Sequence, residues 1–330
     1  MNTFAHKYMI ITPKELQDRI DEFTVVDVRP ETQRNEFPMD GLETIISKDG
    51  STQTIEGKKV LVCQFGIVTE GMIIENDLDN TFSLLGGAQS WIEFQSENED
   101  LSRWSRQTIL PEIGMDGQKK LLNATVAVVG LGGLGCPASQ SLVTAGIGQL
   151  VLIDGDIVEL SNLHRQPLHG TNDIGKKKVK SAEESLNKIN SATIIKIVDE
   201  YLDEQNGLEI IRNCDVVVDA TDTIETRQLI DRFSKETNVP MVYGGLSRWE
   251  GQVAVLNMDG SPGYSELFPD APSGGDTCAD AGVLGMLPNI IGNIQALEAV
   301  KLIVGIEPNL VGKLLIYDGL NHSTNIIRIG

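Results

Sequence analysis

A glycine-rich stretch, AVVGLGGLGCPAS at residues 127–139, follows a run of small apolar residues. Its glycines fall in the order Gly130-x-Gly132-x-x-Gly135, with a further glycine at Gly133. Glycines at this spacing allow a tight turn between a strand and a helix and a close approach of the backbone to phosphate groups. The pattern therefore predicts a nucleotide-binding loop. A tight strand–helix turn without a ligand is the alternative interpretation.

Short apolar runs and helical stretches alternate around this loop. Runs that indicate strands lie at 125–130, 149–154, 193–198, 215–219 and 240–244. The loop itself opens a helix that we expect over 134–145. Later runs, spaced like antiparallel strands, lie at 251–258, 313–319 and 324–330. The alternation predicts an α/β fold with a Rossmann-like, mostly parallel sheet.

Polar residues follow the second of these runs. Asp154 ends the run, where a carboxylate can accept hydrogen bonds from ribose hydroxyls. Asn162 and Arg165 come next, and lysines at 176–178 begin the following helical stretch. Cations gathered near a glycine loop suit a triphosphate better than the pyrophosphate of a dinucleotide. A solvated helix face is the alternative, and we expect it for two of the three lysines.

Two acidic residues mark the end of a later run, in the segment VVVDATDT. Asp219 and Asp222 lie at the carboxyl end of an expected strand, where ligands of open parallel sheets bind. A carboxylate in this position can hold Mg²⁺ on nucleotide phosphates. A helix cap is the alternative interpretation, and it does not exclude the metal role.

The first part of the chain has its own α/β pattern. Apolar runs at 23–28, 59–65 and 81–85 each end at a polar or glycine-rich turn. Residues 96–102 are polar and acidic, which is typical of a linker. Because 330 residues suggest two domains, we expect a small α/β domain at 1–95 and a larger one at 103–330.

The charge, the apolar stretches and the cysteines of the chain limit which partners and which cellular compartment we expect. The formal net charge of −20 is spread along the chain and no basic patch stands out, so we expect no nucleic-acid partner. The N-terminus lacks the apolar core of a signal peptide, and the apolar stretch at 282–304 is interrupted by polar residues. The four cysteines are widely separated and form no CxxC pair. These features predict a cytoplasmic protein without a membrane partner.

From about residue 103 to the end, the chain resembles the ubiquitin-activating-like adenylating enzymes of the MoeB/ThiF/HesA group. Six motifs carry the resemblance, in this order: RWSRQTILPEIG, VGLGGLGCPASQSLVTAGIGQLVLIDGDIVELSNLHRQ, IGKKKVK, DATDT, GQVAV and TCADAGVLGMLPNIIGNIQALEAVK. Members of that group use ATP to adenylate the C-terminal Gly-Gly of a small ubiquitin-fold protein and release pyrophosphate. Six ordered motifs are far more specific than one glycine pattern.

The resemblance implies a role for each matching residue. It implies that the glycine loop holds the nucleotide, that Asp154 binds the ribose and that Asp222 binds Mg²⁺. It implies phosphate contacts for Asn162, Arg165 and Lys178. The loop residues that it assigns to the nucleotide are Gly130, Gly132, Gly133 and Gly135.

Other positions bear on assembly, covalent chemistry and zinc. The resemblance implies that Arg106 reaches the ATP of a partner subunit in a homodimer, with a surface ion pair as the alternative. Cys278 matches a cysteine that bonds to the carrier in some relatives and is dispensable in others. Many relatives bind zinc through CxxC pairs, but Gly263 and Glu266 replace the first pair here, so we expect no structural zinc.

The first domain resembles a rhodanese, through VVDVRPETQRNEF, KKVLVCQFGIVTEG and FSLLGGAQSW. Asp27 and Arg29 match its DVR strand end, and Cys63 matches the sulfur-carrying cysteine at the start of a glycine-containing loop. The loop departs from the usual pattern because it has no cation after the cysteine and carries Glu70 instead. Three interpretations stay open: a persulfide donor, a degenerate scaffold and a docking module.

Together the resemblances predict a carrier-protein adenylyltransferase that also transfers sulfur to make a thiocarboxylate. Its expected partners are a Gly-Gly sulfur carrier and a sulfur donor such as a cysteine desulfurase. The small subunit of molybdopterin synthase is the first carrier to consider, with carriers of thiamine synthesis or tRNA thiolation as alternatives. An NAD-dependent oxidoreductase and a non-catalytic binding module are the rival classes, and the filled phosphate and Mg²⁺ positions disfavour both.

Overall fold

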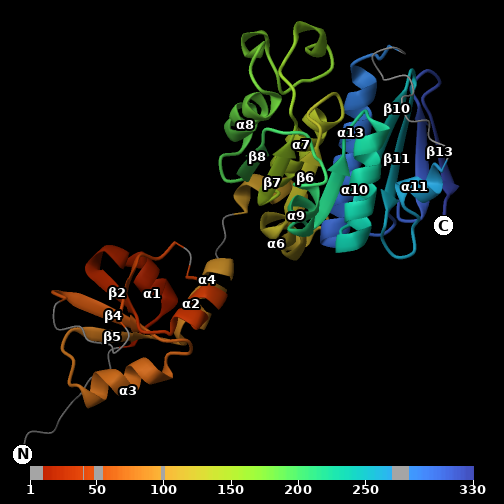
Figure 1. The fold of residues 1–330 in the computed structure, drawn as a ribbon. Coiled ribbons are helices and arrows are strands. Elements are labelled where there is room, and N and C mark those ends of the chain that lie inside the picture. Colours follow the sequence, from red (N-terminus) through yellow and green to blue (C-terminus); the bar gives the residue numbers. More distant parts are fainter. Residues whose placement is uncertain (1–9, 40, 48–54, 98–100, 270–281) are drawn as a thin grey trace, which may run out of the picture. The chain divides into compact units, whose positions relative to one another are not determined.

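The structure is a computed structural model that describes the chain except residues 1–9, 40, 48–54, 98–100 and 270–281. The chain divides into two compact units, Met1–Asp100 and Leu101–Gly330 (Figure 1). Helix α4, Gly87–Glu97, runs two residues into the segment expected as a linker from 96 to 102. Leu101, at the other end of that segment, is buried. Each unit is described below by itself.

The first unit contains a five-stranded parallel sheet in the order β1-β5-β4-β2-β3. Its strands are β1 (Ile10–Ile11), β2 (Phe23–Asp27), β3 (Thr44–Ile46), β4 (Lys58–Val62) and β5 (Thr81–Leu84). Its helices are α1 (Pro13–Asp18), α2 (Glu31–Glu36), α3 (Ile67–Glu75) and α4. The sequence did not indicate β1 and β3, because runs of two or three residues show no period.

Local signals explain how this unit begins. Helix α1 starts at a capping box in which the Thr12 side chain accepts a hydrogen bond from the Glu15 amide, at 3.2 Å. The Glu15 carboxylate in turn accepts from the Thr12 amide, at 3.0 Å. The helix buries Leu16 in a small core that also contains Trp91 of α4 and strand residues such as Val60.

The second unit contains an eight-stranded sheet in the order β13-β12-β11-β10-β9-β6-β7-β8. The parallel strands are β6 (Thr125–Val129), β7 (Gln149–Ile153), β8 (Ile194–Val198), β9 (Val216–Asp219) and β10 (Met241–Ser247). The antiparallel additions are β11 (Glu250–Leu256), β12 (Lys313–Asp318) and β13 (Ser323–Arg328). The predicted Rossmann-like, mostly parallel sheet with antiparallel additions is confirmed.

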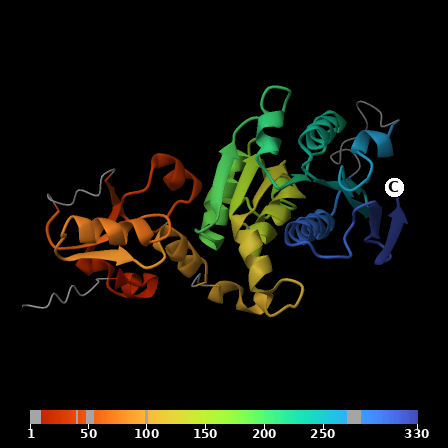
Figure 2. The same ribbon diagram turned by 90° about the horizontal axis from the view of Figure 1, so that it is seen from below.

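Helices cover both faces of this sheet (Figure 2). They are α5 (Ser105–Thr108), α6 (Gly114–Asn123), α7 (Gly135–Ala145), α8 (Lys178–Ile189), α9 (Gly207–Arg212), α10 (Ile224–Thr237), α11 (Tyr264–Leu267) and α13 (Met286–Val304). Helices α6, α7, α8 and α13 contribute to the core on one face, and α9, α10 and α11 to the core on the other. Among the helices described, none is both long and apolar enough to cross a membrane.

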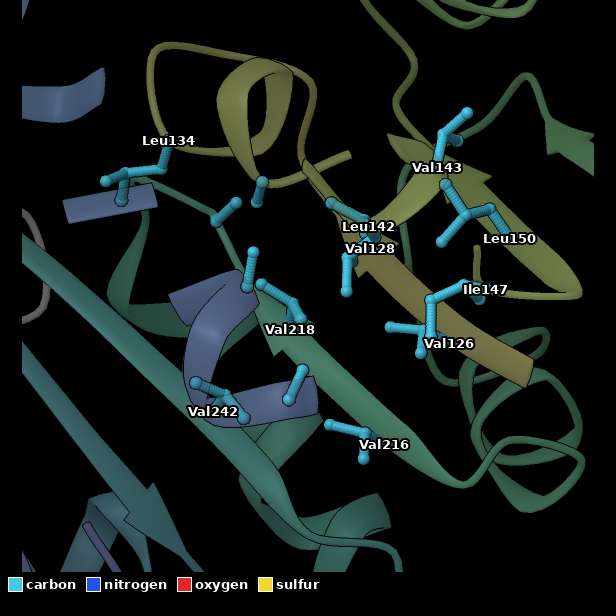
Figure 3. Packing of buried hydrophobic residues seen from close by; sticks show 14 of the residues in the cluster. Val126, Val128, Leu134, Leu142, Val143, Ile147, Leu150, Val216, Val218 and Val242 are labelled. Atoms are coloured by element: carbon cyan, nitrogen blue, oxygen red, sulfur yellow. The ribbon is translucent and has the colours of Figure 1, made fainter. Parts of the chain in front are cut away.

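The alternation of strand side chains builds these two cores. Val126 and Val128 of β6 belong to one core, in which they pack with Leu142 of α7 and other apolar side chains (Figure 3). Ala127 and Val129 of the same strand belong to the core on the opposite face. A strand that is buried on both faces is apolar throughout, which explains the continuous apolar run that precedes the glycine loop.

Candidate active site

A cavity of about 340 Å³ lies at the carboxyl ends of the central parallel strands. Strand β6 lies between β7 and β9, so the connections that leave β6 and enter β9 run to opposite sides of β6. Open α/β sheets bind their ligands at such a switch point, at the carboxyl ends of the strands. The residues predicted for the nucleotide site that line this cavity are Gly130, Gly132, Gly133, Asp154, Asn162, Arg165, Lys178 and Asp222. The glycine loop and side chains from four further segments therefore meet here.

The glycines of the loop serve different purposes. Gly130 has φ +94°, a conformation that favours glycine, and its amide donates to Ile153 O of β7 at 2.8 Å. Gly132 lines the cavity, and an added Cβ there would meet its nearest neighbour only at 3.8 Å. Gly135 does not line the cavity, and a Cβ there would lie 1.8 Å from Gly130 O. Gly135 thus allows α7 to pack tightly behind the loop.

We expect the substitution Gly135→Ala to destabilise the second unit by about 3 kcal/mol, because the added methyl group collides with backbone. Gly132→Ala is the matched control, since its methyl group meets its nearest neighbour at an ordinary van der Waals distance of 3.8 Å. Thermal unfolding of both variants measures the difference. Equal melting temperatures for Gly135→Ala and Gly132→Ala would contradict the packing role.

Asp154 is buried at the end of β7 and is held by backbone amides. Its Oδ2 accepts from the Leu131 amide of the glycine loop at 2.7 Å, and its Oδ1 accepts from the Asp156 amide at 2.8 Å. A carboxylate oxygen has two acceptor positions, so each oxygen keeps one for a ligand hydroxyl. Asp154 therefore holds the backbone of the glycine loop and lines the cavity at the same time.

Of the three lysines that begin the α8 region, one lines the cavity. Lys176 forms ion pairs with Asp173 and Glu184, and Lys177 pairs with Asp199 at 3.0 Å. Lys178 is buried, and its Nζ lies 2.7 Å from Asp156 Oδ2 and 3.8 Å from Asp154 Oδ2. The expectation that two of these lysines belong to a solvated face agrees with this geometry.

The segment between β7 and α8 forms a further wall of the cavity. Asn162 is buried, and its Oδ1 accepts from the Glu159 amide at 3.1 Å. Arg165 Nη1 donates to Ser161 O at 2.9 Å, which turns the guanidinium back along the segment. Gln166 is also buried on this wall, and its Oε1 lacks a hydrogen-bond partner among the described residues.

A buried ion pair supports the loop that presents Asp222. Asp219 Oδ1 accepts from the Thr221 amide at 3.0 Å and from the Thr221 hydroxyl at 2.6 Å. Arg227 Nη2 donates to Thr221 O at 2.7 Å, and Arg227 Nε lies 3.4 Å from Asp219 Oδ2. Thr221 is thus held on both sides, and the exposed Asp222 follows it at the cavity wall.

Cys136 lies behind the loop. Burial raises the pKa of its thiol to about 12, so it stays protonated at neutral pH. Its Sγ donates to Leu131 O at 3.2 Å, and Nε2 of the buried His169 lies 3.6 Å away. Burial also lowers the pKa of His169. These groups pack beneath the nucleotide loop and do not line the cavity.

Comparison with known proteins decides the family. The model of the ThiF family matches residues 104–330, which is most of the second unit. The chain belongs to the ThiF family. Among its relatives, "Adenylyltransferase and sulfurtransferase MOCS3" of Xenopus laevis is 44% identical over 70% of this chain and 52% of its own length. "Sulfur carrier protein adenylyltransferase" of Thermus thermophilus is 43% identical over 68% of this chain and 86% of its own length.

Solved structures give the same fold. PaaA has a TM-score of 0.62 and 26% identity, covering 71% of this chain and 84% of its own. E. coli MccB, crystallised with ATP, has a TM-score of 0.60 and 21% identity, covering 74% of this chain and 78% of its own. This ThiF-family chain spans about half the length of the MOCS3 relatives that it matches.

The remaining predicted residues of the ThiF unit are Arg106 and Cys278. Arg106 is exposed on the short helix α5 and does not line the cavity of its own chain. Cys278 lies outside the described residues. Gly263 and Glu266, at the positions of the missing zinc ligands, flank the start of α11, where the Tyr264 amide donates to Asp231 Oδ1 at 2.7 Å. The absence of zinc stays a prediction.

The first unit lies outside the ThiF match and contains the second candidate site. Cys63 is buried directly after β4, and its Sγ lies 3.5 Å from Thr69 Oγ1. Arg29 Nη1 lies 3.4 Å from Oε1 of Gln64, the next residue after Cys63. The sequence shows no cation in this loop, but the fold brings Arg29 to it. Asp27, whose Oδ2 is 2.8 Å from Arg29 Nη2, neutralises that charge.

Sequence reasoning missed several polar residues that line the ThiF cavity, among them Asp156, Gln166, Tyr201 and Arg227. The DGD spacing at 154–156 was a usable signal for Asp156, because it places a second carboxylate close in sequence to the predicted ribose ligand Asp154. Arg227 also had a usable signal, because it lies in the first turn of the helix that follows Asp222. Tyr201 carries no such signal, since it comes from a separate segment that only the fold places here.

Proposed function

We propose that this ThiF-family chain uses ATP to adenylate the C-terminal glycine of a ubiquitin-fold sulfur-carrier protein. One observation carries the proposal: a single cavity at the switch point of the sheet gathers the glycine loop, Asp154, Arg165, Lys178 and Asp222. The names of its relatives support the same activity. We take the small subunit of molybdopterin synthase as the first carrier to test, with thiamine-pathway and tRNA-thiolation carriers as alternatives.

Adenylation needs charge neutralisation more than it needs a base. The carrier's C-terminal carboxylate is already ionised at neutral pH, and its oxygen attacks the α-phosphorus while the bond to the β-phosphate oxygen breaks and pyrophosphate leaves. Two anions must meet for this to happen, so fixed cations and alignment supply the catalysis. We assign phosphate contacts to Lys178, Arg165 and Asn162, and ribose hydrogen bonds to Asp154.

Asp222 fits a Mg²⁺ ion that arrives with the nucleotide. It is an exposed carboxylate on the cavity wall, and the described residues contain no cluster of three or more His, Cys, Asp or Glu side chains that could hold a metal alone. Mg²⁺ is usually held by one or two carboxylates together with substrate phosphates and water. When bound, the ion would neutralise phosphate charge, and the Asp219–Arg227 pair would keep Asp222 in place.

The proposal includes a homodimer in which Arg106 of each protomer completes the partner's site. Exposure of Arg106 away from its own cavity supports this assignment, since a guanidinium that serves in trans must project from the surface. Cys278, which matches a carrier-bonding cysteine of some relatives, is a candidate for a covalent carrier adduct.

We further propose that the first unit is a rhodanese-like domain and delivers sulfur through Cys63. The terminal sulfur of a Cys63 persulfide attacks the carrier acyl-adenylate, so a C–S bond forms, the acyl C–O bond breaks and AMP leaves. A thiol reductant then cleaves the S–S bond, is itself oxidised to a disulfide, and releases the carrier thiocarboxylate and Cys63 thiol. A persulfide donor such as a cysteine desulfurase reloads Cys63. One chain with both activities raises the local sulfur concentration.

Replacing Cys63 by alanine is expected to abolish transfer of labelled sulfur to the carrier and to leave ATP–pyrophosphate exchange unchanged. Cys214→Ala is the matched control, because Cys214 is a buried cysteine of the other unit whose Sγ donates to the backbone carbonyl of Ile210, at 3.2 Å. Gel autoradiography after incubation with ³⁵S-loaded desulfurase measures transfer. Full labelling of the carrier by Cys63→Ala would leave the first unit as a scaffold or docking module.

A panel of purified carriers tests the adenylation itself. Each carrier is incubated with the protein and MgATP, and mass spectrometry detects the carrier adenylate. We expect an adenylate on at least one Gly-Gly carrier and none on the same carrier without its last glycine. A panel on which no carrier gains AMP would contradict the proposed function.

A further inference from the structure

Tyr201 stands on the cavity wall in a position that its own loop fixes. It follows β8, and its carbonyl accepts from Asn206 Nδ2 at 3.0 Å. Asn206 Oδ1 also accepts from the Asp203 amide at 3.0 Å, and Asp203 Oδ1 accepts from the Asn206 amide at the same distance. This reciprocal pair makes the loop backbone rigid just after Tyr201.

The ring of Tyr201 rests on Gly155, between Asp154 and Asp156. A Cβ at Gly155 would lie 3.0 Å from Cδ2 and Cε2 of that ring and 3.1 Å from Cζ. A side chain at Gly155 would push the ring away by a few tenths of an ångström, so the glycine allows this close approach of the ring to the backbone. The contact places the phenol hydroxyl beside the Asp156 carboxylate, to which it donates a hydrogen bond at Oδ1.

Asp156 also contacts the buried Lys178. Asp156 Oδ2 accepts from Lys178 Nζ at 2.7 Å, so both carboxylate oxygens of Asp156 are engaged and the group cannot turn freely. Burial opposes ionisation of Asp156, but the hydrogen bonds from Lys178 and Tyr201 outweigh it and lower its pKa. The hydrogen bond to Asp156 raises the pKa of Tyr201 to about 12, so the phenol keeps the proton that it donates.

We propose that Tyr201 is a positioning residue that fixes Asp156, which in turn fixes Lys178 Nζ in the pose that meets the nucleotide phosphates. A lysine ammonium on a four-carbon stem loses considerable rotamer entropy when it is held in one place. The Tyr201–Asp156 pair provides that constraint before the nucleotide arrives. The inference rests on the proposed nucleotide site and adds a residue from a segment that carries none of the motifs.

The test is a double-mutant cycle on MgATP affinity, measured by isothermal titration calorimetry. Tyr201→Phe keeps the ring on Gly155 and removes only the hydroxyl, and Asp156→Asn removes the carboxylate charge. We expect each single substitution to weaken MgATP binding about fivefold, as for one partly exposed charge-assisted hydrogen bond. The double variant should bind no more weakly than Asp156→Asn alone, because the hydroxyl acts only through Asp156.

Tyr317→Phe is the matched control. Tyr317 belongs to β12 and does not line the cavity, and its hydroxyl lies 3.2 Å from His322 Nδ1, so its loss should leave the affinity unchanged. Two results from the variants would overturn the inference: a wild-type affinity for MgATP in Tyr201→Phe, or losses of binding free energy that add in the double variant. A wild-type protein that fails to bind MgATP would also overturn it. A wild-type protein that binds MgATP with the expected coupling, yet adenylates no carrier, would retain the inference and refute the proposed function.

Discussion

Lys178→Ala is expected to reduce carrier-dependent ATP–pyrophosphate exchange about a thousandfold, as when a preorganised group that stabilises transition-state charge is removed. Lys178 Nζ is the buried cation of the cavity wall, and Asp154 and Asp156 both lie within ion-pair distance of it. Its loss leaves those carboxylates facing the triphosphate without a counter-charge. Initial rates of labelled pyrophosphate incorporation into ATP measure the effect.

Lys176→Ala is the matched control for this result. Lys176 is two residues away, pairs with Asp173 and Glu184, and does not line the cavity. Its removal takes away the same charge from the same segment, so we expect exchange close to that of the wild type. Thermal unfolding confirms that both variants remain folded. Exchange by Lys178→Ala within a few fold of the Lys176→Ala rate would contradict the phosphate role.

Arg106→Ala is expected to lose exchange by a similar factor, and a mixed dimer is expected to recover it. If Arg106 acts in trans, a dimer of one Arg106→Ala protomer and one Lys178→Ala protomer has one site with both defects and one site with neither. Such a dimer should therefore show about half of the wild-type activity. The two protomers are co-expressed with different tags, and the mixed dimer is isolated by sequential affinity steps.

An arginine that acts within its own chain predicts the opposite outcome. Each site of the mixed dimer would then carry one defect, and the mixture would be as inactive as its parents. Full exchange by Arg106→Ala alone would show instead that Arg106 forms only a surface ion pair. The mixed dimer thus separates the two placements without a structure of the dimer.

The sequence predicts the central part of the fold because each element there leaves a local signal. The run before Gly130 is apolar because β6 is buried on both faces, and the glycine spacing marks the turn into α7. The sequence also predicts the position of Asp154, because this residue comes directly after the apolar run of the neighbouring strand β7. The edge strands β1 and β3 leave no comparable signal, because they are two and three residues long.

The parts that the sequence does not predict depend on contacts between distant segments. Tyr201 donates to Asp156 across 45 positions of sequence, and no motif marks a lone tyrosine after a strand. Arg29 contacts Gln64 of the Cys63 loop from 35 positions away in the sequence, so the loop lacks a cation only when its own residues are considered alone. Gly135 is a further example. It belongs to the glycine motif, but the fold places it behind the loop, against the backbone of Gly130, and not in the cavity wall.

The most direct test of the central claim is ATP–pyrophosphate exchange by the wild-type protein with two forms of one carrier. One form keeps its C-terminal Gly-Gly, and the other lacks the last glycine, so that the attacking carboxylate is displaced from the α-phosphate. Adenylation predicts rapid exchange with the intact carrier and background exchange with the shortened carrier or with none. Exchange that is equal in all three reactions, or absent with every Gly-Gly carrier, would contradict it.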